Sequence, residues 1–262
     1  MDDYNKLKKS LRNTQYLIII VMGLVVIGFA FDFLSVQKTV STNEENLQTK
    51  PLKTQYIVQN LKGDAIETWY AWQPRDKLEI QIVGENNYPT EKIDAIKKAI
   101  LSTDIIEIDN SLVFKGDEGT YSYYWIGWKG AADHIREQRG IEEPLEIIFT
   151  DKDNADVIIT LTNSKSGEGL SGQTSSSVND AEQTILRSFV TIYEADKLSN
   201  ELMEIIIRHE FGHVVGLAHS TAPEDLMYPV IQTPAPFISE CDIDALLHLY
   251  TGGKTSQVVC ER

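Results

Sequence analysis

The stretch RHEFGHVVGLAHS, residues 208–220, contains three of the five histidines of this 262-residue chain. His209 and His213 are four residues apart, so on a helix they lie on one face, one turn from each other, and can point at a single ion. Gly216 permits the left-handed turn that ends such a helix, and this turn can bring His219 to the same ion. The spacing therefore predicts a metal centre built on a helix and the turn after it.

Three imidazoles and one open position form a typical catalytic zinc site. Zinc lowers the pKa of a bound water toward roughly 7 and polarises a substrate carbonyl group. Glu210 follows the first histidine, where its carboxylate can accept the proton of the water and pass it to a leaving amine. This combination predicts hydrolysis of an amide bond. The alternative is an amphipathic helix with incidental histidines, and the full HExxHxxGxxH pattern argues against it.

The hydrophobic pattern of the surrounding chain predicts one α+β domain of mixed strands and helices. Ser199 can cap the helix that carries the metal ligands. Another helix should begin at Pro89, where isoleucine and alanine recur at three- and four-residue spacing, and a last one near Asp242. Strands are predicted at 78–84, 145–150, 155–162 and 185–193.

HEFGHVVGLAHS followed by DLMYP at 225–229 resembles the metzincin zinc peptidases, and among them the matrixins. The resemblance covers residues 145–252. It implies a zincin-like catalytic domain, in which a twisted mixed sheet carries an active-site helix and a C-terminal helix around one catalytic Zn²⁺. It also implies that Met227 lies in a tight turn beneath the zinc ligands. The segment GLSGQTSSS at 169–177 then corresponds to an edge strand along which an extended peptide substrate pairs.

The chain departs from the matrixin pattern at several positions. Gln173 and Ser175 stand in the region where matrixins commonly hold histidines for a structural zinc, so we expect one zinc ion only. No cysteine precedes Cys241, so the propeptide cysteine of that family is missing. Ile231 replaces the aromatic wall of the specificity pocket, so the resemblance gives no substrate preference. Calcium is allowed, but no motif supports it.

An apolar segment without charges, YLIIIVMGLVVIGFAF at 16–31, follows four basic residues within 6–12. This pattern predicts an uncleaved membrane anchor with the rest of the chain outside the cytoplasm. A cleaved signal peptide is the alternative, because Gly28 and Ala30 suit a signal peptidase, and the domain would then be secreted. The expected organisation is a cytoplasmic tail (1–15), a transmembrane signal-anchor (16–34), a polar linker (35–54) and the matrixin-like domain (55–262).

The part of the chain after residue 34 is strongly acidic. Removing the four basic and three acidic residues of 1–34 from the totals of 24 and 39 leaves a net charge of −16. Nucleic-acid binding is excluded, because it requires basic patches. The only cysteines are Cys241 and Cys260, which favours one disulfide in an exported chain, with two free buried thiols as the alternative.

The segment YSYYWIGW at 121–128 holds five aromatic residues. It could grip a carbohydrate or an extended peptide, but packing in the core or a subdomain is favoured because aromatic side chains gain much from burial. His134 and His248 receive no role. The sequence therefore predicts a membrane-anchored, extracytoplasmic zinc metalloendopeptidase. The alternatives are a surface binding protein that keeps the zinc scaffold and a structural surface protein without metal, and the intact Glu210 favours the enzyme.

Overall fold

The computed structural model describes residues 52–58, 70–73, 75–113, 117–220 and 225–252. The apolar segment 16–34 lies outside these ranges, so the membrane anchor stays a prediction. Among the described helices, none has both the length and the apolar character needed to cross a membrane.

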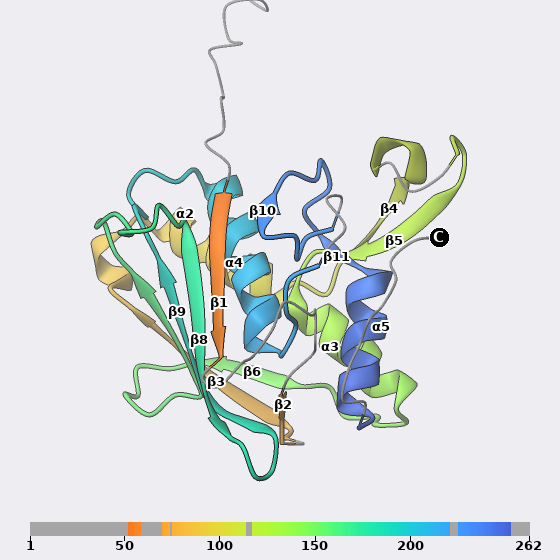
Figure 1. The fold of residues 1–262 in the computed structure, drawn as a ribbon, viewed down its shortest axis with the longest axis horizontal. Helices are drawn as coiled ribbons and strands as arrows, with labels where there is room; N and C mark the ends of the chain where they lie inside the picture. Colours follow the sequence, from red (N-terminus) through yellow and green to blue (C-terminus); the bar gives the residue numbers. More distant parts are fainter. Residues whose placement is uncertain (1–51, 59–69, 74, 114–116, 221–224, 253–262) are drawn as a thin grey trace, which may run out of the picture. The chain divides into compact units, whose positions relative to one another are not determined.

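A mixed sheet forms one side of the domain (Figure 1). Its strand order is β10-β1-β8-β9-β7-β3-β6, with β2 beside β9. The strands β1, β8 and β9 are adjacent, with β1 parallel and β9 antiparallel to β8. The bounds are β1 (Leu52–Val58), β2 (Ala71–Trp72), β3 (Lys77–Val83), β6 (Glu146–Phe149), β7 (Val157–Leu161), β8 (Gly172–Asn179), β9 (Thr184–Ile192) and β10 (Val230–Ile231).

Alternating apolar residues explain the inner strands. In β3, Leu78, Ile80 and Ile82 face the core, while the residues between them are partly exposed. The strands predicted at 78–84, 145–150, 155–162 and 185–193 are confirmed as β3, β6, β7 and β9. The mixed α and β composition agrees with the predicted fold class.

The strand expected at 169–177 is present as β8, but its predicted free edge is wrong. Residues 54–58 of β1 pair with 172–176 of β8, and residues 52–53 pair with β10. β1 therefore covers the edge along which a substrate was expected to pair. Its first residues, 52–54, belong to the segment that the sequence assigned to the linker.

The helices pack against the sheet and against one another (Figure 1). α2 (Thr90–Leu101) lies beside α4 (Asn200–Val214), and α4 also contacts β8 and β9. α3 (Trp128–Gln138) and α5 (Glu240–Tyr250) pack together next to α4. The short 3-10 helices are η1 (Glu85–Asn87) and η2 (Asn110–Val113). The helices predicted from Pro89 and near Asp242 are thus confirmed as α2 and α5.

Both ends of α4 follow the local signals in the sequence. The Ser199 side chain accepts a hydrogen bond from the backbone N–H of Leu202, which caps the first turn. At the other end, Gly216 has a φ of 103°. The N–H of Leu217 donates to the carbonyl of Gly212 at 2.9 Å, which closes a Schellman turn. The chain reverses between the second and third histidines of the opening motif, as the glycine predicted.

A smaller sheet, in the order β11-β5-β4, is inserted between α2 and α3 and completed by a strand near the C-terminus. Its strands are β4 (Ile105–Asp109), β5 (Tyr121–Trp125) and β11 (Ile238–Ser239). In the aromatic segment 121–128, Tyr124, Trp125 and Trp128 are buried, as predicted for packing. Tyr121 and Tyr123 remain 56% and 51% exposed.

The last helix begins with a capping box. The Asp242 carboxylate accepts hydrogen bonds from the backbone N–H and the hydroxyl of Ser239, and the Ser239 hydroxyl accepts one from the Asp242 N–H. Cys241 stands between them, and it is not a free thiol. Cys260 lies outside the described residues, so its pairing with Cys241 stays a prediction.

Candidate metal centre

The three histidines of the opening motif converge on one point. The Nε2 atom of His219 lies 3.3 Å from Nε2 of His209 and 3.2 Å from Nε2 of His213. One ligand atom from each ring lies within 4.8 Å of the others, and they form the only group of this kind found in the described part of the chain. The helix α4 supplies two of the rings, and the reversal at Gly216 brings the third to them.

This spacing fits a zinc ion. Tetrahedral zinc with Zn–N bonds of about 2.0–2.1 Å separates two ligand nitrogens by roughly 3.3–3.4 Å. The other ring nitrogens are already engaged: Nδ1 of His209 lies 2.7 Å from the carbonyl of Leu226, and Nδ1 of His213 lies 2.9 Å from the carbonyl of Leu217. A carbonyl only accepts, so each Nδ1 carries the proton and each Nε2 presents a lone pair to the centre.

Burial keeps these imidazoles in the form that binds metal. It lowers the pKa of His209 to about 3 and of His219 to about 4, and it lowers the pKa of His213 well below the ordinary value. The rings are therefore neutral at neutral pH, as metal ligands must be. Two Nε2 lone pairs only 3.2 Å apart repel each other unless a cation lies between them, which is a second sign that the donor set suits a metal.

Met227, for which the resemblance implied a place beneath the zinc ligands, packs against α4 at Gly212. A Cβ atom at Gly212 would lie 2.8 Å from Cε of Met227, so α4 can rest on the thioether only because residue 212 has no side chain. The turn itself is held by Asp225, whose carboxylate accepts a hydrogen bond from the Met227 N–H at 2.7 Å. The Met227 carbonyl accepts one from the N–H of Ser220 at 2.8 Å. The turn is thus bonded to the segment that carries the third histidine.

Glu210 is fully buried beside the first ligand. Its Oε2 atom accepts a hydrogen bond of 2.6 Å from the Thr174 hydroxyl, whereas Oε1 has no hydrogen-bond partner among the described residues. Burial raises the pKa of this carboxyl to about 8, and the hydrogen bond from Thr174 opposes that rise. A cation held by the histidines would favour the ionised carboxylate.

Arg208, for which the sequence predicted no role, links α4 to two other segments of the chain. Its side chain is 1% exposed, and burial lowers its pKa to about 10. The guanidinium donates to the carbonyl of Ile126 at 2.8 Å and to that of Pro236 at 2.7 Å. The carbonyl of Arg208 accepts a 2.7 Å hydrogen bond from the indole of Trp128. One residue therefore joins the metal-binding helix to the inserted segment and to the segment after the methionine turn.

The remaining histidines lie away from the centre. His134 is half-buried with its ring 5.0 Å from that of Trp125, and His248 is exposed on α5. Gln173, in the region where a structural zinc was not expected, accepts a hydrogen bond from the hydroxyl of Tyr193. Among the described residues, neither His134 nor His248 joins a group of His, Cys, Asp or Glu side chains suited to a metal ion.

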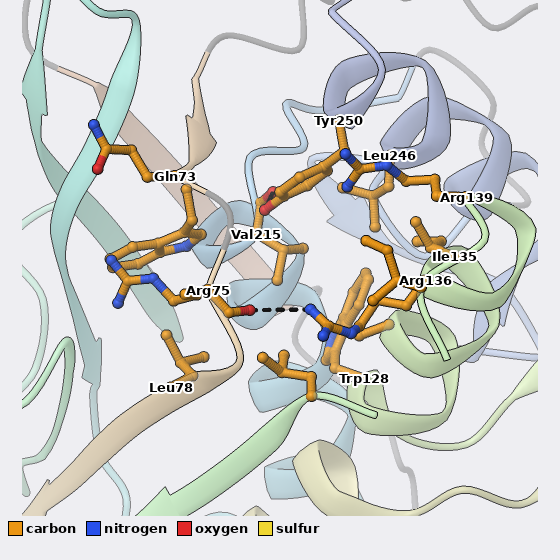
Figure 2. A pocket seen from close by; sticks show the side chains of 14 residues that line it. Gln73, Arg75, Leu78, Trp128, Ile135, Arg136, Arg139, Val215, Leu246 and Tyr250 are labelled. Carbon is orange, nitrogen blue, oxygen red and sulfur yellow. Dashed lines mark hydrogen bonds between the residues drawn. The ribbon is translucent and has the colours of Figure 1, made fainter. Parts of the chain in front are cut away.

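Figure 2 shows an apolar pocket that is lined by residues of β2, β3, α3, the end of α4 and α5. Two of its arginines, Arg75 and Arg136, are engaged within the protein. Arg75 pairs with Asp156 at 2.7 Å and lies over the ring of Trp72, and Arg136 binds the carbonyl of Arg75 and the carboxylate of Asp76. Neither the three converging histidines nor Glu210 lines this pocket, so it is separate from the candidate metal centre.

Comparison with known proteins agrees with this geometry. The family model described as matrixin matches residues 142–251. Matrix metalloproteinase-9 from Canis lupus familiaris is 47% identical over 47 residues, which cover 18% of this chain. That match spans only 7% of the length of the relative. The matched residues 142–251 include all three histidines and Glu210, and the predicted resemblance to matrixins is confirmed.

Replacing His213 with alanine should abolish stoichiometric zinc binding, because two imidazoles do not complete a three-histidine site. Metal analysis of the purified chain after zinc loading checks this. His248→Ala is the matched control, since that histidine is exposed and far from the motif in the sequence, and it should keep about one zinc per chain. Stoichiometric zinc in His213→Ala would contradict the assigned ligand set.

Proposed function

We propose that the chain is a zinc-dependent endopeptidase that hydrolyses peptide bonds of proteins outside the cytoplasm. One observation carries the proposal: three histidines each bring a ring nitrogen within 4.8 Å of the others. Glu210, next to the first of them in the chain, is buried, and one of its carboxylate oxygens has no partner among the described residues. The matrixin match over residues 142–251 supports the same reaction class. Because that match covers only part of the chain, the activity of the whole protein remains a proposal.

Different residues of the chain would bind the ion and transfer the proton. His209, His213 and His219 would hold the ion, which supplies an acidified water and polarises the substrate carbonyl group. Glu210 accepts a proton at Oε1, the oxygen without a partner in the described part of the chain, and later gives it to the leaving amine. Burial of the carboxylate excludes bulk water from this transfer.

An extended peptide is the substrate class that the sheet suits best. A peptide that adds to β8 would gain main-chain hydrogen bonds, and Gly172 at the start of β8 lies directly against the Glu210 side chain. The strand β1 occupies this edge, with Thr54 opposite Gly172. Substrate pairing along β8 therefore requires β1 to leave. The apparent affinity for substrate then depends on the fraction of molecules in which β1 has left β8.

Weakening β1 should therefore increase activity. In the full chain, Gln55→Pro together with Tyr56→Pro removes two backbone donors from adjacent positions of the strand, so at least one bond to β8 is lost. Losing one or two backbone hydrogen bonds costs about 1–3 kcal/mol, so KM for a peptide substrate should fall by roughly 5- to 100-fold at unchanged kcat. The same double proline at Asn46 and Leu47, upstream of β1, is the control. Equal KM values in all three proteins would show that β1 does not compete with substrate.

Replacing Glu210 with glutamine should separate binding from chemistry. The amide has a similar volume and leaves every histidine in place, but it cannot act as a base. Zinc content should stay near one ion per chain, while peptide hydrolysis falls by roughly 10²–10⁴-fold or more. Metal analysis and the peptidase rate on one preparation check both parts. Undiminished hydrolysis would favour the alternative function, a surface binding protein that keeps the zinc scaffold, because the measured activity would then belong to a contaminant.

The cellular location is part of the proposal. Residues 16–34 are proposed to anchor the chain in the membrane, with residues 35–262 outside the cytoplasm, on the basis of the basic residues that precede the apolar run. Protease added to intact cells should digest an epitope tag placed after Arg262. Protection of the tag until the cells are lysed would reverse the orientation, and release of the tagged protein into the medium would indicate a cleaved signal peptide.

A further inference from the structure

The face of β8 that meets α4 is polar, whereas Val190 and Ile192, which pair with it on β9, are buried and apolar. Gly172, Thr174 and Ser176 alternate on it and are buried. Burying hydroxyl groups costs stability unless each one is hydrogen-bonded. The Ser176 hydroxyl lies 2.8 Å from that of Ser188 on β9, so this pair satisfies itself within the sheet. Thr174 is different, because its bonds leave the sheet and reach the helix that carries the metal ligands.

The Thr174 hydroxyl lies 2.6 Å from Oε2 of Glu210 and 3.1 Å from the Glu210 backbone carbonyl. A hydroxyl has one proton to donate, and the shorter contact to a carboxylate oxygen receives it. Thr174 itself is 0% exposed and held in the sheet between β1 and β9. A donor fixed in a sheet therefore orients a carboxylate that stands on a helix.

Gly172 limits the same carboxylate from a second direction. A Cβ atom at this position would lie 2.8 Å from Cγ of Glu210 and would overlap Oε1. The side chain of Glu210 thus fills the space that any other residue at 172 would occupy. Gly172 and Thr174 together restrict the position of the Glu210 carboxylate. In this position Oε2 is hydrogen-bonded, and Oε1 has no partner among the described residues.

We infer that Thr174 and Gly172 are positioning residues for the reaction. Thr174 holds Oε2, so that Oε1 is the oxygen that accepts the proton, and Gly172 leaves the room in which the carboxylate sits. The inference rests on the proposed peptidase function and goes beyond it by assigning different roles to the two oxygens of Glu210. The competing explanation is that Thr174 only satisfies its own hydroxyl through the Glu210 backbone carbonyl at 3.1 Å.

Three substitutions test Thr174 by rate. Thr174→Val keeps the shape and removes the donor, so kcat should fall by about 10- to 100-fold with KM and zinc content unchanged, because the base loses its alignment. Thr174→Ser keeps the donor and should retain most of the rate. Thr184→Val is the matched control, since its buried hydroxyl has no hydrogen-bond partner among the described residues, and it should leave kcat unchanged. A kcat for Thr174→Val equal to that of Thr174→Ser would overturn the inference.

Gly172 is tested by adding a single methyl group. Gly172→Ala should lower kcat at unchanged zinc content, because the methyl group displaces the carboxylate. Gly167→Ala is the control: a Cβ atom there meets nothing within 4 Å, and its φ is not left-handed. Full kcat in Gly172→Ala would show that Glu210 does not need this space.

A stability measurement tests the contact without relying on catalysis. In metal-free protein, Thr174→Val should lower Tm by roughly 3–10 °C when Glu210 is present, and by clearly less when Glu210 is replaced with alanine. Equal losses in both backgrounds would assign the whole effect to the backbone carbonyl and overturn the inference. If the wild-type chain hydrolyses no peptide, the proposed function fails, while this cycle still decides whether Thr174 holds the carboxylate.

Discussion

Two hydrogen bonds, from Nδ1 of His209 and of His213 to backbone carbonyl groups, are the interactions on which the rest of the site depends. They connect α4 to the methionine turn at Leu226 and to the reversal at Leu217. Each bond fixes the protonated nitrogen of its ring, so the two remaining lone pairs face the same point as the ring of His219. Without them the same three histidines could be neighbours in the sequence and still not form a ligand set.

The site concentrates polar side chains at buried positions. The rings of His209 and His213 and the carboxylate of Glu210 are fully buried, and each loses hydration on folding. Arg208 adds a buried cation immediately before them. Such a cluster opposes folding unless its members bond to one another or to an ion, so metal binding and stability are coupled here. The bonds from Thr174 and to the two leucine carbonyls offset part of this cost before any ion binds.

Local sequence signals predicted the elements that depend on local physics. The alternation in β3, the cap at Ser199 and the left-handed Gly216 each act over a few residues, and all three agree with the structure. The pairing of β1 with β8 could not be predicted, because the paired residues are more than 100 residues apart and the first residues of β1 belong to the predicted linker. The contact of Thr174 with Glu210 could not be predicted either, because the two residues are 36 positions apart and no local pattern pairs them.

The proposed centre surrounds a zinc ion with three imidazole nitrogens and one exchangeable oxygen. X-ray absorption at the zinc edge of the loaded, full-length protein measures this ligand set. Nitrogen and oxygen scatterers are expected at about 2.0–2.1 Å, with the outer-shell pattern of three imidazoles and no sulfur. A sulfur scatterer at about 2.3 Å, or fewer than three imidazoles, would rule out this ligand set.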